Sequence, residues 1–314
     1  RTDEEKAQQN AKESLYLVSE YANEYFQKIL HKTDQGKAIG LSYFKERGFT
    51  EETIKKFQLG YALDEWQAFT DDALGKGYKL EFLEQTGLTI VKDQKRFDRF
   101  KGRVMFPIHS MSGRILGFGG RILTNDKKAA KYVNSPESEI YNKSKILYGI
   151  YESRQSIFKD DLCILVEGYM DVLQFHENGI KNVLASSGTS LTEDQITLIS
   201  RLTSNIVLLF DGDTAGVNAA LRSTDMILEK GLNVKICSFP EGEDPDSYVK
   251  DNKKDKTLDF INNNSKDFIE FKLSFYNEDL KDEDKKVDVI KSVIKSISKI
   301  PDRLKQEVYI KKCS

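Results

Sequence analysis

The chain has 314 residues, of which 39% are hydrophobic and 31% are charged, and its formal net charge is −2. This length predicts two or three domains, and the charge content indicates a soluble protein. No apolar run approaches the ~18 residues of a membrane-spanning helix, which argues against a membrane protein or a membrane partner. Residue 1 is Arg and no signal peptide is visible, so we expect a segment of a longer or processed protein.

Cysteine is rare in this sequence. Cys163 and Cys237 lie in apolar runs that are typical of strands, and Cys313 lies near the last residue. Because there is no CxxC pair and no Cys/His cluster, we expect no structural zinc site in this chain. Reduced, buried thiols are typical of cytoplasmic proteins, so we expect that location.

The N-terminal part of the chain has a helical pattern. Apolar residues recur at three- and four-residue spacing in residues 1–35, which predicts a long amphipathic helix. Residues 37–60 predict a helical pair, in which Gly48 ends the first helix and Thr50 caps the second. Residues 66–86 again have a helical pattern.

Between residues 97 and 123 the pattern changes to alternation. The turn signal Ser112-Gly113 within it predicts a small subdomain of antiparallel β-hairpins. From Lys92 to Lys145 there are thirteen Lys or Arg residues and five Asp or Glu residues, a local excess of eight positive charges. These charges are interleaved with glycines and aromatic residues, which favours binding of a polyanion over a plain solvated face.

Residues 163–239 alternate between strand and helix patterns, which predicts βαβ units with right-handed crossovers and a parallel sheet. Thr192 and Gln195 predict a capping box at the start of one helix. Residues 257–312 are polar with helical apolar repeats and predict a small helical subdomain. The expected strands are 163–166, 182–186, 205–210 and 233–239, and the expected helices are 170–178, 192–202 and 214–230.

Carboxylates follow the expected parallel strands at the points where strands end. Glu167 follows the first strand, and Asp211 and Asp213 follow the third. Because ligands bind at the carboxyl ends of strands in such sheets, we expect these side chains to lie close together. Carboxylates at one edge repel each other unless a cation lies between them. The sequence therefore predicts a magnesium site for phosphate chemistry.

Further acids extend this predicted cluster. Asp171 follows Glu167 by four residues, and Asp244 and Asp246 lie on the loop after the fourth strand. A pair of ions about 3.5–4 Å apart would activate a 3′-hydroxyl and neutralise a leaving pyrophosphate. The alternative is that these acids only stabilise helix N-termini, and this alternative has most weight for Asp244 and Asp246.

At these residues the chain resembles a known family. The arrangement of Glu167-Gly168 and Asp211-x-Asp213 is similar to the Toprim domain, which bacterial primases, topoisomerases and some nucleases share. Other segments resemble the central RNA polymerase domain of bacterial DnaG-type replicative primases, and the resemblance covers essentially the whole chain. These segments are residues 103–108, 117–121, 131–137, 147–149 and 166–171.

The resemblance implies an α/β fold, α+β overall, in three parts. Residues 1–130 would form an N-terminal mixed α/β, basic subdomain. Residues 131–248 would form a Toprim metal-binding subdomain with a Rossmann-like parallel sheet. Residues 249–314 would form a C-terminal helical subdomain.

The resemblance also implies an activity. The chain would be the DNA-dependent RNA polymerase core of a replicative primase, which makes short RNA primers from NTPs on single-stranded DNA by metal-assisted nucleotidyl transfer. The implied cofactor is Mg²⁺, with Mn²⁺ as a substitute, and no zinc is expected. The implied catalytic metal ligands are Glu167, Asp211 and Asp213, supported by Asp171, Asp244 and Asp246.

Basic residues upstream would hold the nucleic acid and the nucleotide. A basic groove that follows a phosphate backbone gives salt-sensitive binding with little sequence preference. Each of these cations taken alone is also compatible with a plain surface charge. The residues implied for nucleotide and phosphate binding are Arg121, Lys131, Asn134 and Lys143, and those implied for template binding are Arg47, Arg99 and Arg103.

The family also has an N-terminal zinc-binding domain and a C-terminal helicase-binding domain. We expect neither in this chain, so an interaction with the replicative helicase would require a domain that is absent here. The implied partners are the single-stranded DNA template, NTPs and the RNA primer product, in the cytoplasm at the nucleoid and replication fork.

Other functions use the same acids. A second possibility is another Toprim enzyme, a nuclease or a topoisomerase. A topoisomerase needs a tyrosine nucleophile in a separate cleavage domain, and we expect no such domain in this sequence. A non-catalytic Toprim scaffold that only binds nucleic acid is disfavoured because all the acids are present. The primase-like segments also disfavour a phosphoacceptor role for Asp211.

Overall fold

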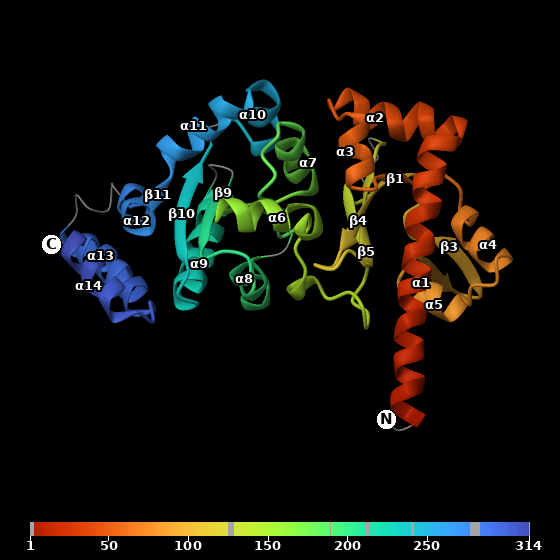
Figure 1. The fold of residues 1–314 in the computed structure, drawn as a ribbon, viewed down its shortest axis with the longest axis horizontal. Coiled ribbons are helices and arrows are strands. Elements are labelled where there is room, and N and C mark those ends of the chain that lie inside the picture. Colours follow the sequence, from red (N-terminus) through yellow and green to blue (C-terminus); the bar gives the residue numbers. More distant parts are fainter. Residues whose placement is uncertain are drawn as a thin grey trace. The chain divides into compact units, whose positions relative to one another are not determined.

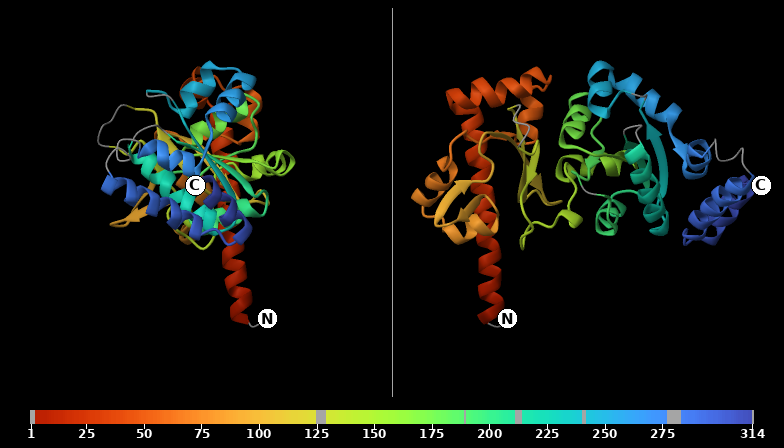
Figure 2. Two further views of the ribbon diagram at one scale, coloured as in Figure 1. Left: turned by 90° about the vertical axis from the view of Figure 1, so that its left-hand side faces the viewer. Right: turned by 180° about the vertical axis from the view of Figure 1, so that it is seen from behind.

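The computed structural model describes residues 3–124, 129–188, 190–210, 214–239, 242–276 and 283–313. The chain forms two compact units, Arg1–Glu152 and Ser153–Ser314, and each is described by itself. The first unit runs from red to yellow-green in Figure 1 and the second from green to blue, and Figure 2 shows both from two further sides. Among the described residues, no helix is both long and apolar enough to cross a bilayer.

The first unit is built on one long helix, as residues 1–35 predict. Helix α1 (Asp3–Lys32) packs against the sheet of this unit. Its buried face includes Phe26, whose ring lies 5.3 Å from that of Phe69 and 5.5 Å from that of Phe118. The other helices are a π-helix (Gly36–Leu41), α2 (Ser42–Glu46), α3 (Glu51–Lys56), α4 (Ala68–Gly75) and α5 (Leu80–Gln85).

Local sequence signals place the ends of these helices. Thr50 caps α3 as predicted, because its hydroxyl accepts the N–H of Thr53 at 3.4 Å. The helical pattern of residues 66–86 is interrupted at Gly77, which has a φ of +88° and separates α4 from α5. Glycine tolerates this left-handed conformation, whereas most other residues are strained by it.

The antiparallel sheet of the first unit confirms the predicted hairpin. Its strand order is β1-β4-β5-β6, and β4 and β5 pair around the predicted turn. A separate hairpin, β2 with β3, was not predicted from the sequence. The strands are β1 (Gly60–Tyr61), β2 (Thr89–Lys92), β3 (Lys95–Asp98), β4 (Arg103–His109), β5 (Ile115–Ile122) and β6 (Tyr132–Asn134).

The second unit confirms the predicted βαβ units. Its sheet has the order β11-β10-β9-β7-β8, in which the three strand pairs from β10 to β8 are parallel and β11 is antiparallel to β10. The strands are β7 (Cys163–Val166), β8 (Val183–Ala185), β9 (Asn205–Phe210), β10 (Asn233–Ser238) and β11 (Lys266–Asp267).

Helices connect these strands and follow them. The capping box of α8 is present, since Thr192 accepts the N–H of Gln195 at 3.2 Å and Gln195 accepts the N–H of Thr192 at 3.1 Å. The helices are α6 (Ile150–Asp160), α7 (Tyr169–Glu177), α8 (Glu193–Ser200), α9 (Thr214–Glu229), α10 (Pro245–Asp251), α11 (Lys254–Asn264), α12 (Phe268–Phe275), α13 (Glu283–Ser298) and α14 (Arg303–Cys313).

A buried polar cluster joins the C-terminal helices to α9. Lys272 on α12 is buried, and its Nζ donates to Ser296 Oγ on α13 at 2.5 Å and lies 3.5 Å from Asp225 Oδ1 on α9. Burial lowers the pKa of this lysine, and the nearby Asp225 opposes that shift. A lysine is rarely buried without such partners, so this cluster fixes how α12 and α13 pack on α9.

The division of the structure differs from the expected subdomain boundaries. The expected boundary after residue 130 lies inside the first unit, where β6 pairs with β5. The expected boundary after residue 248 lies inside α10 of the second unit. Hydrogen bonding across a sheet joins segments that the linear pattern separates. The three-part division of the sequence stays a prediction.

Candidate functional site

The acidic turn after β7 is held by its backbone. The four residues of β7 are buried, and Glu167 follows with an exposed side chain. Asp171 Oδ2 accepts the N–H of Gly168 at 2.9 Å, and the carbonyl of Glu167 accepts the N–H of Ser187 at 3.0 Å. The sequence thus ends a buried strand, turns at Gly168 and starts α7 in a way that presents the Glu167 carboxylate at the strand end.

Asp171 therefore has an observed structural contact in addition to its predicted role. One of its carboxylate oxygens accepts the backbone N–H of Gly168, the N-cap residue of α7. A carboxylate at this position also interacts favourably with the helix dipole. Its support of a metal ion stays a prediction.

The other two predicted catalytic acids, Asp211 and Asp213, lie outside the described residues. The described strand before them, β9, ends at Phe210 and pairs in parallel with β7, with Leu165 opposite Leu208. Strand β9 therefore ends at the same edge of the sheet as β7. Within the described residues, no group of three or more His, Cys, Asp or Glu could hold a metal ion.

Asp244 has the contacts of a helix cap. It is the N-cap of α10, and its Oδ1 accepts the N–H of Ser247 at 2.7 Å and the hydroxyl of Ser247 at 2.8 Å. The alternative that the sequence left open, an acid at a helix N-terminus, is thus observed for Asp244. Asp246 lies in the first turn of the same helix and is half-buried. Metal binding by either residue stays a prediction.

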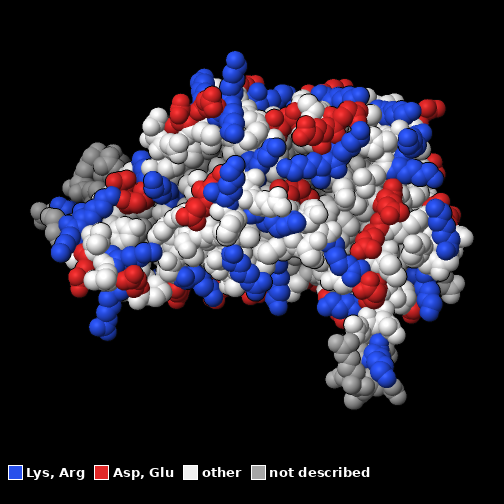
Figure 3. All heavy atoms as spheres, viewed as in Figure 1, with Lys and Arg blue, Asp and Glu red and all other residues white. Residues whose placement is uncertain are grey.

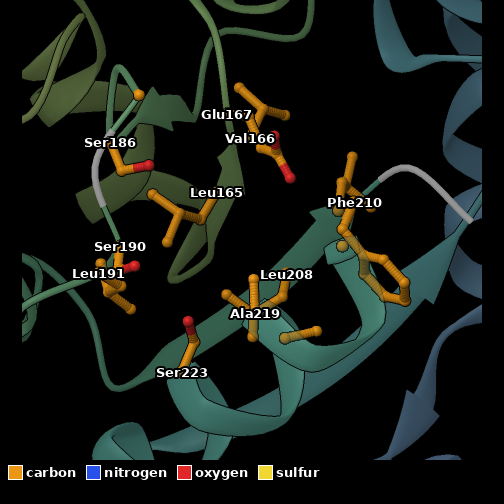
Figure 4. Close-up of a pocket in the computed structure, with 14 residues that line it drawn as sticks. Leu165, Val166, Glu167, Ser186, Ser190, Leu191, Leu208, Phe210, Ala219 and Ser223 are labelled. Carbon is orange, nitrogen blue, oxygen red and sulfur yellow. The ribbon is translucent and has the colours of Figure 1, made fainter. Parts of the chain in front are cut away.

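A cavity of about 360 Å³ opens at this edge of the sheet (Figure 4). Glu167 and three serine side chains line it, and leucines of β7 and β9 form its apolar floor. Figure 4 shows two of these serines on the loop after β8 and the third on α9. The serines are Ser186, Ser190 and Ser223.

The loop after β8 was missed in the sequence. Ser187 has a φ of +58° and Gly188 a φ of +81°, so two consecutive residues adopt the left-handed conformation. This conformation is uncommon for a residue other than glycine and often marks a functional site. The signal that could have found this loop is the hydroxyl-rich run Ser186-Ser187-Gly188 directly after a buried strand.

The donor set at this edge fits a hard cation. The described lining offers carboxylate and hydroxyl oxygens, and it includes no thiol and no imidazole. Mg²⁺ and other hard divalent ions prefer oxygen ligands, whereas thiolates and imidazoles select softer metals. The chemistry of the residues present is therefore compatible with the divalent ion that the sequence predicts.

The basic residues of the first unit have different surroundings. Arg121 on β5 lies over the ring of Tyr43 at 4.9 Å and near that of Tyr132 at 5.9 Å, and its Nη1 donates to the hydroxyl of Tyr43. Lys131, just before β6, is exposed. Arginine held on an aromatic face is oriented rather than mobile, which suits binding of a phosphate.

Three further predicted residues lie close to these elements or to α2. Arg99 is half-buried and its Nε donates to the carbonyl of Asn134 on β6 at 3.3 Å. The backbone N–H of Lys143 donates to Glu137 at 3.0 Å, and Lys143 is half-buried. Arg47 follows α2 as its C-cap and is also half-buried. Their binding roles stay predictions.

Arg103, which the resemblance implies for template binding, has structural contacts within the first unit. It is buried, and its Nη1 donates to the carbonyls of Gly120, Ala130 and Lys131 at 3.2, 3.0 and 3.3 Å. Burial also lowers the pKa of its guanidinium group. Every residue of β4 is buried, and Arg103, at its first position, holds the segment before β6 through the carbonyls of Ala130 and Lys131. Its role in template binding stays a prediction.

Charge is mixed over the visible surface. On the face drawn in Figure 3, Lys and Arg side chains are interspersed with Asp and Glu side chains. This mixture agrees with a net charge of −2 on 98 charged side chains, 48 basic and 50 acidic. The positive excess of residues 92–145 is therefore a local property of the first unit.

The chain matches three family models. Residues 25–154 match the DNA primase catalytic core, N-terminal domain, and residues 164–249 match a Toprim-like model. Residues 269–314 match the DnaB-helicase binding domain of primase. The last match corrects our expectation that a helicase-binding region is absent, because it covers α12, α13 and α14.

The chain is similar to about half the length of curated proteins that are named DNA primase. A DNA primase of Halalkalibacterium halodurans is 37% identical over 308 residues, which is 96% of this chain and 51% of the relative. A DNA primase of Clostridium acetobutylicum is 38% identical over 305 residues, 96% of this chain and 50% of the relative. The chain thus spans about half the length of the curated relatives that it matches.

Solved structures match nearly the whole chain. A DnaG primase catalytic domain bound to ssDNA is 31% identical, with a TM-score of 0.87 over 96% of this chain and 98% of that one. A DNA primase domain from Pseudomonas aeruginosa is 34% identical, with a TM-score of 0.85 over 95% and 94%. These likenesses confirm the mixed α/β fold, and the chain belongs to the family of bacterial DnaG primase catalytic cores.

Proposed function

We propose that this chain is the DNA-dependent RNA polymerase core of a replicative primase, which joins NTPs into short RNA primers on a single-stranded DNA template. The observation that carries the proposal is the similarity of nearly the whole chain to a DnaG catalytic domain described as bound to ssDNA. The acidic strand end at Glu167, in a cavity lined by oxygen donors, supports metal-assisted nucleotidyl transfer.

The acids at the sheet edge would hold the cofactor, Mg²⁺ with Mn²⁺ as a substitute. Glu167, Asp211 and Asp213 would be its ligands. Divalent ions in such a site lower the pKa of an attacking hydroxyl and neutralise a leaving pyrophosphate. Glu167 is suited to this role because the hydrogen bond from the Gly168 N–H to Asp171 fixes the turn on which it lies. Asp244 and Asp246 would contribute from the start of α10.

The basic residues of the first unit would bind phosphates and the template. Arg121, held on Tyr43, would bind phosphates of the nucleotide or of the template, together with Lys131, Asn134 and Lys143. Arg47 and Arg99 would contact the single strand. Arginine forks match phosphate oxygens with two parallel hydrogen bonds, whereas lysine acts as a point charge.

Two further points follow from this proposal. The segment that matches a helicase-binding model, residues 269–314, would be a contact region for the replicative helicase. The site of action would be the cytoplasm, at the replication fork. Both points depend on the activity being that of a primase.

The test is primer synthesis by this chain. We expect it to make short oligoribonucleotides from NTPs on single-stranded DNA, in a reaction that requires Mg²⁺ or Mn²⁺. Asp211→Ala is expected to abolish incorporation and to leave the circular dichroism spectrum unchanged. Retained synthesis by this variant would contradict the metal assignment, and DNA cleavage without synthesis would favour a Toprim nuclease or topoisomerase instead.

A further inference from the structure

Helix α7 is attached at both ends to segments that carry acids. At its start, Asp171 accepts the N–H of Gly168 at 2.9 Å and so holds the turn of the first acid. At its end, the side-chain amide of Asn178 donates to the carbonyls of Val249 and Asn252 at 2.9 and 2.6 Å. Both carbonyls belong to the C-terminal end of α10. One short helix therefore contacts both segments.

The side-chain hydrogen bonds of Asn178 are made to the C-terminal end of α10. Two carbonyl acceptors require a donor, so the Nδ2 group must face α10. The Oδ1 atom is buried and has no hydrogen-bond partner among the described residues. Burial of a polar atom without a partner is unfavourable, and the two bonds to α10 offset that cost. The side chain is therefore placed for its contact with α10.

Helix α10 transmits this contact to the acids at its other end. It has seven residues, so it is about 10 Å long. Pro245 and Val249 are buried, and the capping box of Asp244 closes its first turn. A short, capped and anchored helix moves as one body. A shift of its C-terminal carbonyls therefore shifts Asp244 and Asp246.

We propose that Asn178 is a positioning residue of the metal site. It fixes, through α7, the distance between the turn that carries Glu167 and the segment that carries Asp244 and Asp246. Asn178 itself touches neither metal nor substrate. This inference rests on the proposed function, because it assumes that acids of both segments serve one site.

The test replaces the donor of Asn178 in two ways. Asn178→Ala removes the amide, and Asn178→Asp keeps its shape but presents only acceptors to the two carbonyls. In both variants we expect the Mg²⁺ concentration for half-maximal primer synthesis to rise about tenfold or more, as is usual for residues that orient metal ligands. Mn²⁺ binding measured by calorimetry on the whole chain should weaken by a similar factor.

Asn264→Ala is the matched control. Its amide donates to the carbonyl of Phe260 at 2.8 Å within α11, so this variant removes a comparable bond at a helix end and leaves the link between α7 and α10 intact. We expect a lower melting temperature with unchanged Mn²⁺ affinity and unchanged Mg²⁺ dependence. A purely structural role of Asn178 would instead give the same behaviour in all three variants.

The outcomes separate the two proposals. The positioning role is wrong if both Asn178 variants fold and bind Mn²⁺ as tightly as the wild type, or if Asn264→Ala weakens binding equally. If the wild type makes no metal-dependent product, the proposed function fails, and the comparison of Mn²⁺ affinities still decides whether Asn178 positions the acids.

Discussion

Glu167 owes its position to the backbone around it. The buried strand before it, the N–H of Gly168 and the loop after β8 fix the turn, and the side chain itself is exposed. An exposed carboxylate can be replaced by an amide of the same shape with little effect on the fold. Its chemistry and its structural role are therefore separable by mutation.

We expect Glu167→Gln to lower metal-dependent primer synthesis by roughly 100-fold or more, because loss of a ligand costs more than loss of a group that orients one. The free energy of unfolding should change by less than about 0.5 kcal/mol. Initial rates at several Mg²⁺ concentrations and thermal denaturation measure the two effects. Asp194→Asn, an exposed acid on α8, is the control and should leave synthesis unchanged.

We expect Arg103 and Lys131 to differ in role, with Arg103 stabilising the fold and Lys131 binding nucleic acid. Arg103→Met removes the guanidinium that donates to the carbonyls of Gly120, Ala130 and Lys131, and the Lys131 carbonyl keeps the N–H of Ile122. We expect the free energy of unfolding to fall by about 2–4 kcal/mol in denaturant titrations. Lys131→Ala removes an exposed charge, and it should leave stability unchanged while weakening the binding of single-stranded DNA. An Arg103→Met variant as stable as the wild type would contradict the structural role.

Asp98 has a pKa that burial changes. Its carboxylate accepts the N–H groups of Phe69 and Thr70 at 2.8 and 3.0 Å and the Thr70 hydroxyl at 2.7 Å. Burial raises its pKa above the ordinary 3.8, and these hydrogen bonds only partly oppose the shift. The folded state therefore holds the proton more strongly than the unfolded state.

The pH dependence follows from that direction. The stability contributed by protonated Asp98 is full below pH 3.8 and is lost as the pH rises through the raised pKa of the folded state. We expect an NMR titration of the Asp98 carboxyl carbon to have its midpoint above 3.8. A midpoint at or below that value would show that the hydrogen bonds outweigh burial.

At the scale of elements, the helix ends were the most predictable features. Thr50 and Thr192 cap α3 and α8 as their sequences indicate, because capping depends on residues only three positions apart. Three short strands, β1, β6 and β11, were not predicted, since a segment of two or three residues has no period to detect. Their existence depends on the neighbouring strand. The three-residue strand β8 was predicted from the alternation of strands and helices around it.

The capping box of α8 gives a prediction of stability. Thr192→Ala removes the acceptor for the N–H of Gln195, and we expect the free energy of unfolding to fall by about 1 kcal/mol. Thermal denaturation measures the change. Thr197→Ala, within the same helix, removes only a bond to the carbonyl of Glu193 and should change stability less. Equal losses in the two variants would mean that the cap has no special role.

At the scale of the whole molecule, charge is divided unevenly along the chain. The first unit contains the local excess of positive charge between residues 92 and 145, whereas the net charge of the chain is −2. Binding of a polyanion by this chain would thus be a local electrostatic effect. Such binding releases counterions and weakens steeply with salt.

We expect affinity for a single-stranded oligonucleotide to fall roughly 100-fold between 50 and 200 mM salt, given about 0.7 of slope per phosphate contact and about five contacting cations. Fluorescence anisotropy at several salt concentrations measures the slope. Lys256→Glu, an exposed change on α11 of the second unit, should leave the slope unaltered. A slope near zero would contradict a basic binding surface. The five cations are Arg47, Arg99, Arg121, Lys131 and Lys143.

The sequence by itself determined the order of strands and helices in residues 163–239, the acids at the strand ends and the family resemblance. These features are local, because periodicity, caps and motifs involve neighbouring residues. Only the tertiary structure decided that Arg103 is buried and that the side chain of Asn178 donates hydrogen bonds to the end of α10. Asn178 and Val249 are 71 positions apart, and no pattern of neighbouring residues predicts a contact at that separation. The burial of Arg103 likewise depends on carbonyls that sheet pairing brings to it.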